Sequence, residues 1–64
     1  MTTDELRSEF FALADEFALG NKQLGAIFGR KPQTISMYRS GRDPVPELLL
    51  YKMRELAVAI RAIK

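Results

Sequence analysis

The chain has 64 residues, which suffices for one domain and no more. It contains no Cys and no His, which excludes disulfides and the usual structural zinc sites and leaves oligomerisation as the way to stabilise so small a core. No apolar run approaches the roughly 20 residues of a membrane-spanning helix, and the acidic, polar start is unlike a secretory signal. We therefore expect a cytoplasmic single-domain protein with no cofactor, no metal, no small-molecule ligand and no membrane association.

Charge is distributed unevenly along the chain, behind a net charge of +2. Residues 1–20 hold five acids against Arg7, a balance of −4. Residues 21–42 hold five Lys or Arg and no acid, a balance of +5. Such a separation gives one face a positive potential that attracts phosphate and another face that repels it.

A first helix is expected over about residues 3–19. Thr2 and Glu5 have the spacing of a capping box at its start. Apolar residues then recur at helical spacing, and Gly20 is expected to end the helix in a left-handed conformation. The acids are interpreted as the solvated back of this helix. The apolar stripe consists of Leu6, Phe10, Leu13, Ala14 and Phe17, flanked by Phe11 and Ala18.

Two short helices are expected next, over about residues 22–28 and 32–40. Asn21 can cap the first of them, and Gly29 ends it. Pro32 suits the first turn of the second, because its missing N–H would have no partner there. Gly41 ends the second helix. The inward positions of the pair are predicted to be Leu24, Ile27, Phe28, Ile35 and Tyr38.

The break between these helices has the spacing that a helix-turn-helix requires. Two short helices that meet at a steep angle need a small residue at the point of approach, which Gly25 supplies. The turn needs a residue that tolerates positive φ, which Gly29 supplies four residues later. Ile35 is then placed to fill the gap, and Tyr38 follows on the same face.

Residues 21–50 resemble the helix-turn-helix of the phage-repressor and Cro-like family of transcriptional regulators. Two positions depart from the family pattern, because Arg30 stands where an apolar residue is usual and Lys31 where Ser or Thr is usual. The resemblance implies an all-α domain that binds operator DNA. The positions that match the pattern are Gly25, Gly29, Ile35, Ser36, Tyr38, Gly41 and Pro46.

The resemblance also implies which residues face double-stranded DNA. In the docking mode of that family, the second helix of the motif lies in the major groove with its N-terminal part against the base edges. Gln33 there can pair with adenine, and Met37 can contact a thymine methyl or pack within the protein. The base-reading residues are expected to be Lys31, Gln33, Thr34 and Met37. Contacts to the DNA backbone are expected from Asn21, Lys22, Gln23, Arg30, Ser36, Tyr38, Arg39 and Arg42.

A long last helix is expected over about residues 46–63, where strong helix formers dominate. Its main apolar stripe is Leu49, Met53, Leu56, Ile60 and Ile63. More apolar residues lie on nearly the opposite side, and an exposed patch of that kind usually marks an interface. We expect a two-fold homodimer with recognition helices about 34 Å apart; the alternative is a monomer. The expected interface residues are Leu48, Tyr51, Glu55, Val58, Ala59 and Ala62.

The sequence thus predicts an all-α, four-helix domain over residues 1–64 that is not an enzyme, because it has no His or Cys and its acids lie on a solvated helix face. The expected function is sequence-specific binding of operator or promoter DNA as a Cro-like repressor, with autoregulation as one option. The alternative is a protein-interaction module, an inhibitor or adaptor that uses the same surface. Small regulators of this build occur in phages, in toxin–antitoxin and restriction–modification loci and beside anti-CRISPR genes, and the sequence does not choose among these contexts.

Overall fold

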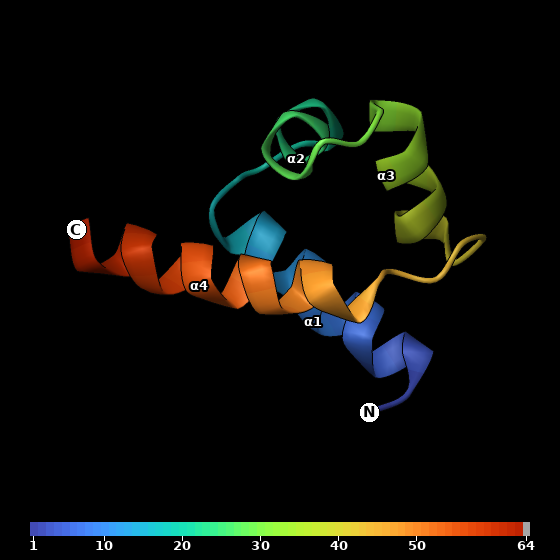
Figure 1. The fold of residues 1–64 in the computed structure, drawn as a ribbon, viewed down its shortest axis with the longest axis horizontal. Helices are drawn as coiled ribbons and strands as arrows, with labels where there is room; N and C mark the ends of the chain where they lie inside the picture. Colours follow the sequence, from blue (N-terminus) through green and yellow to red (C-terminus); the bar gives the residue numbers. More distant parts are fainter. Residues whose placement is uncertain (64) are drawn as a thin grey trace.

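The computed structural model describes residues 1–63, which form four helices and no strand. These are α1 (Thr3–Glu16), α2 (Asn21–Phe28), α3 (Pro32–Ser40) and α4 (Glu47–Ile63). The pair α1 and α4 lies side by side, and α2 and α3 lie together on one side of that pair (Figure 1). The expected all-α fold of four helices is confirmed. No helix among the described residues has both the length and the apolar character needed to cross a membrane.

Helix α1 begins as predicted and ends earlier than predicted. The Thr2 hydroxyl accepts a hydrogen bond from the Glu5 N–H at 3.2 Å, and the Glu5 carboxylate accepts one from the Thr2 N–H at 3.0 Å, which confirms the capping box. The helix ends at Glu16, and Ala18 takes the left-handed conformation with φ of 56°. The Leu19 N–H then donates to the Ala14 carbonyl at 2.9 Å, as in a Schellman motif.

The expectation that Gly20 ends α1 is therefore wrong. Gly20 has φ of −78° and is the N-cap of α2, so that Asn21 is the first helical residue rather than the cap. The physical reason lies in Leu19, which packs against the core. The chain has to turn before Leu19 to bring that side chain inward, and Ala18 is the residue that makes the turn.

The turn between α2 and α3 follows the prediction. Gly29 has φ of 67° and its N–H donates to the Gly25 carbonyl, and Gly41 ends α3 with φ of 83°. Pro32 occupies the first turn of α3. One inward position is wrong, because Ile27 is 47% exposed. Helix α2 has only eight residues, and Leu24 and Gly25 are the two that it buries.

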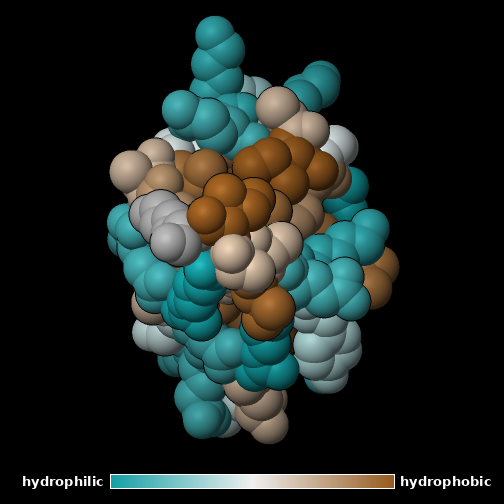
Figure 2. Space-filling model, turned by 90° about the vertical axis from the view of Figure 1, so that its left-hand side faces the viewer, coloured by the Kyte–Doolittle hydropathy of each residue, from teal (hydrophilic) through white to brown (hydrophobic). Residues whose placement is uncertain are grey.

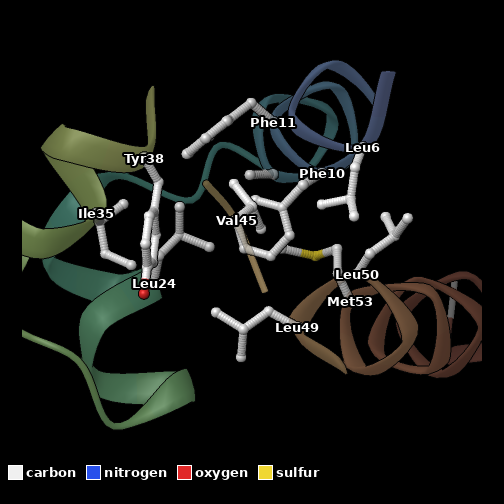
Figure 3. Packing of buried hydrophobic residues seen from close by; sticks show 11 residues of the cluster. Leu6, Phe10, Phe11, Leu24, Ile35, Tyr38, Val45, Leu49, Leu50 and Met53 are labelled. Atoms are coloured by element: carbon white, nitrogen blue, oxygen red, sulfur yellow. The ribbon is translucent and has the colours of Figure 1, made fainter. Parts of the chain in front are cut away.

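The core is built from all four helices and from Val45 in the loop before α4. Figure 3 shows side chains of α2 and α3 on one side of this cluster and those of α1 and α4 on the other, with Val45 between them. The largest fully buried side chains are Phe10, Leu24, Ile35, Leu50 and Met53.

Helix α4 buries a slightly different face from the predicted stripe. Leu50 and Ala57 are buried, although neither belongs to the predicted stripe. Leu56 and Ile60 are half-buried, and Ile63 is 85% exposed. Figure 1 shows the reason, because the C-terminal end of α4 extends past the end of α1 and has no helix beside it.

Two bidentate ion pairs join α1 to α4. Arg54 Nη2 donates to Glu9 Oε1 at 2.9 Å, and Arg61 Nη2 donates to Glu16 Oε1 at 2.9 Å. The two pairs are seven residues apart on each helix, so that they lie on one seam between helices that run in the same direction. The view of the α1 acids as a solvated back is corrected here, because these two glutamates link helices.

Candidate nucleic-acid interface

Two buried side chains fix the orientation of α3. Ile35 is fully buried and Tyr38 is 7% exposed, and both point into the core (Figure 3). Helix α2 also packs closely against the turn that follows it, because a Cβ placed on Gly25 would clash with the Arg30 carbonyl oxygen. The inward face of α3 is thereby held, and its opposite face is presented to solvent.

Three of the four predicted base-reading residues lie at or just before the first turn of α3, and Met37 lies one turn further along. Lys31, the N-cap residue, and Gln33 are exposed, whereas Thr34 and Met37 are half-buried. Met37 follows Gln33 by four residues and Thr34 by three, which places all three side chains on neighbouring parts of one helix surface. Within residues 1–63 none of these four side chains forms a hydrogen bond or an ion pair, so their polar ends are available to a ligand.

Exposed cations without a carboxylate partner lie along residues 21–42, at the start of α2, in the α2–α3 turn and after α3. Lys22 at the start of α2, Lys31, and Arg42 after α3 form no ion pair with any described residue. Arg30 Nη1 donates to the Phe28 carbonyl at 3.2 Å, which holds the guanidinium beside the turn while leaving its charge uncompensated. Ser36, on the exposed surface of α3, has no side-chain partner among residues 1–63.

The arginines outside this region are paired. Arg7 contacts Asp4 at 3.2 Å, and Arg54 and Arg61 join Glu9 and Glu16. Hydrogen bonds from the Arg54 guanidinium hold the pKa of the Glu9 carboxyl below its usual value. Lys52 on α4 is the one other Lys or Arg of the described residues without a carboxylate partner. Uncompensated positive charge is thus concentrated at the start of α2, the α2–α3 turn and the two ends of α3.

Besides Arg30, four residues predicted to contact the DNA backbone are hydrogen-bonded or buried within the protein. Arg39 Nε donates to Asn21 Oδ1 at 3.3 Å, and Arg39 Nη1 donates to Asp15 Oδ1 at 3.3 Å. Gln23 Oε1 accepts a hydrogen bond from the Gly20 N–H at 2.9 Å. Tyr38 is buried in the core. Nothing in the sequence pointed to the contact between Arg39 and Asp15, which lie 24 residues apart.

The predicted dimer residues all lie on the exposed surface of α4. Leu48 is 59% exposed, Tyr51 48% and Val58 65%. Glu55, Ala59 and Ala62 are exposed as well. Figure 2 shows apolar side chains gathered on the face of the molecule at the C-terminal end of α4.

Polar contacts cross the same surface of α4. The Tyr51 hydroxyl donates to Glu47 Oε1 at 2.6 Å, which raises the pKa of the Tyr51 phenol. The Arg54 guanidinium lies 5.8 Å from the centroid of the Tyr51 ring. Polar side chains therefore border Tyr51, and they border Val58 as well, because Arg54, Glu55 and Arg61 lie three or four residues from it on the helix.

Residues 1–63 contain no group of three or more Cys, His, Asp or Glu side chains placed to hold a metal ion. No protein-family model matches the chain, and neither the curated proteins nor the solved structures that were searched gave a match.

Proposed function

We propose that this protein is a sequence-specific regulator of transcription that binds double-stranded DNA through α3, in the manner of a Cro-like repressor. One observation carries the proposal: the arginines outside residues 21–42 are compensated by acids, whereas Lys22, Arg30, Lys31 and Arg42 are not. Phosphate is the ligand that such a concentration of free cations favours. Blocking a promoter by occupancy is the proposed mode of action.

The dimensions of α3 support this assignment. An α-helix with its side chains is about 10–12 Å across, which matches the width of about 12 Å of the major groove of B-DNA. With Ile35 and Tyr38 in the core, Gln33 and Thr34 of the first turn are the side chains that would meet base edges. Lys22 and Arg42 would then contact the phosphates beside the groove, which positions the helix without reading sequence.

The proposal includes a homodimer formed by α4. The exposure of Leu48, Tyr51 and Val58 supports it, because so many large apolar side chains on one helix are unusual for a small monomer. A two-fold pair of chains would bind a near-palindromic site with half-site centres about 34 Å apart. Sedimentation of the protein at tens of micromolar tests this part, and a single species of 7.3 kDa would refute it.

Selection of bound sites from random double-stranded DNA, followed by titration at several salt concentrations, tests the DNA-binding proposal. The expected result is enrichment of a sequence with two symmetric half-sites. With four free cations per protomer, the slope of log K against log salt concentration is expected to be about −7 for the dimer. Failure to enrich any sequence, or affinity that does not change with salt, would refute the proposal.

A protein-interaction module is the second candidate, and the exposure of Ile27 on α2 favours it. An apolar side chain of that size beside the basic turn would suit contact with a protein surface. The two candidates differ in the effect of Ile27→Ser. This substitution leaves DNA affinity unchanged if α3 binds DNA alone, and it abolishes binding if the ligand is a protein seated across α2.

A further inference from the structure

Arg39 lies where three helices meet. It belongs to the last turn of α3, while its partners Asp15 and Asn21 belong to the end of α1 and the start of α2. The guanidinium carbon also lies 4.4 Å from the centroid of the Phe11 ring, within the range of a cation–π contact. Its face is thus covered by an aromatic ring, and its edge donates to two oxygens on different helices.

We propose that Arg39 is a positioning residue: it fixes the C-terminal end of α3 to α1 and α2 and so sets the direction in which Gln33 and its neighbours face. The inference rests on the proposed DNA-binding function for its consequence, whereas the contacts themselves are independent of DNA. It changes the expected role of this residue, because two of the five N–H donors of the guanidinium already bind Asn21 and Asp15, and the Asp15 carboxylate compensates its charge.

The arrangement requires arginine specifically. A planar guanidinium can stack on Phe11 and donate from two different nitrogens in one plane, which an ammonium cannot do. A phosphate contact by a surface cation, in contrast, needs charge and reach, which Lys supplies. Arg39→Lys therefore separates the two roles.

The first test is thermal unfolding of Arg39→Ala, Asp15→Ala, the double variant and Arg39→Lys. Each single change is expected to lower Tm by roughly 1–8 °C, which is the range for one partly exposed ion pair in a domain of this size. The Tm of the double variant is expected to be no lower than that of the less stable of the two single variants, Arg39→Ala and Asp15→Ala. Arg39→Lys is expected to lose stability as Arg39→Ala does. Additive losses, or a lysine variant with wild-type Tm, would overturn the proposal.

The second test is DNA binding, with Arg42→Ala as the matched control. Arg42 is also an arginine close to the end of α3, and its side chain has no partner within residues 1–63. Arg39→Ala is expected to keep the wild-type salt slope and to reduce several-fold the preference for the selected site over random DNA. Arg42→Ala is expected to reduce the salt slope by about 1 per protomer and to keep that preference.

The outcomes separate the two proposals. A smaller salt slope with an unchanged preference in Arg39→Ala would make Arg39 a phosphate contact and overturn its positioning role. If the wild-type protein binds no DNA, the proposed function fails, while the unfolding experiment still decides whether Arg39 and Asp15 are coupled.

Discussion

Substitution of Gly25 by Ala has two opposing effects on the free energy of unfolding, and the structure shows which of them is larger. Alanine favours a helix over glycine by about 1 kcal/mol. Against this gain, the new Cβ would clash with the Arg30 carbonyl oxygen, which is backbone and cannot rotate away. Overpacking of this kind costs about 1–3 kcal/mol. The turn also contains the hydrogen bond from the Arg30 N–H to the Gly25 carbonyl at 2.8 Å, whose net contribution is about 0.5–1.5 kcal/mol.

We therefore expect Gly25→Ala to destabilise the protein by about 1–2 kcal/mol, which corresponds to a fall in Tm of roughly 4–16 °C in a domain of this size. The measurement is thermal unfolding followed by circular dichroism. Gly20→Ser is the matched control on the same helix, because a Cβ there meets only the flexible end of Gln23 and the hydroxyl can cap α2. The control is expected to keep Tm or raise it by about 1–3 °C. A Gly25→Ala variant more stable than the wild type would refute the reasoning.

Three further predictions concern other parts of the molecule. Ala18→Gly should stabilise the protein by about 0.5–1 kcal/mol in urea unfolding, since Ala18 is exposed and has φ of 56°; a loss of stability would contradict this. Hydrogen bonds from Arg54 lower the pKa of Glu9 from 4.5, so the ion pair stabilises the fold above pH 4.5 and this stabilisation is lost as the pH falls through the lowered pKa. The difference in Tm between the wild type and Glu9→Gln should therefore shrink towards zero in acid. Gln33→Ala should relax the base preference at one position by about 1–3 kcal/mol, whereas Lys22→Ala should weaken all sites alike and reduce the salt slope by about 1, as measured by titration of single-base variants of the selected site.

Local chemistry made most of the helix boundaries predictable. The capping box at Thr2, the left-handed glycines at positions 29 and 41 and Pro32 at the start of α3 each depend on interactions within a few residues. The spacing of Ile35 and Tyr38 likewise identifies the buried face of α3 without knowledge of the rest of the fold. The end of α1 did not follow, because Gly20 offered an equally good local stop and the choice of Ala18 depends on where Leu19 packs.

Exposure at the edges of the core could not be predicted in the same way. Ile27 and Ile63 continue helical apolar patterns, and nothing in either pattern says where the neighbouring helix ends. In the structure α1 stops at Glu16, which pairs with Arg61, and Ile63, two residues further along α4, is exposed. The residues of the candidate DNA interface show the same division. Their exposure follows from helix spacing, whereas the ion pair between Arg39 and Asp15 depends on a contact between distant parts of the chain.

The same ion pairs change the electrostatic character of the molecule. Formal charges along the sequence describe an acidic first helix, a face expected to repel DNA. In the structure Asp4, Glu9, Asp15 and Glu16 each contact an arginine, so α1 is largely compensated rather than repulsive. One of those arginines, Arg39, belongs to the basic residues 21–42. Four cations without a carboxylate partner therefore remain there instead of five. Attraction to phosphate is then local to the start of α2, the α2–α3 turn and the end of α3. Because the compensated surface adds little long-range repulsion, the salt dependence of binding should report those few contacts alone.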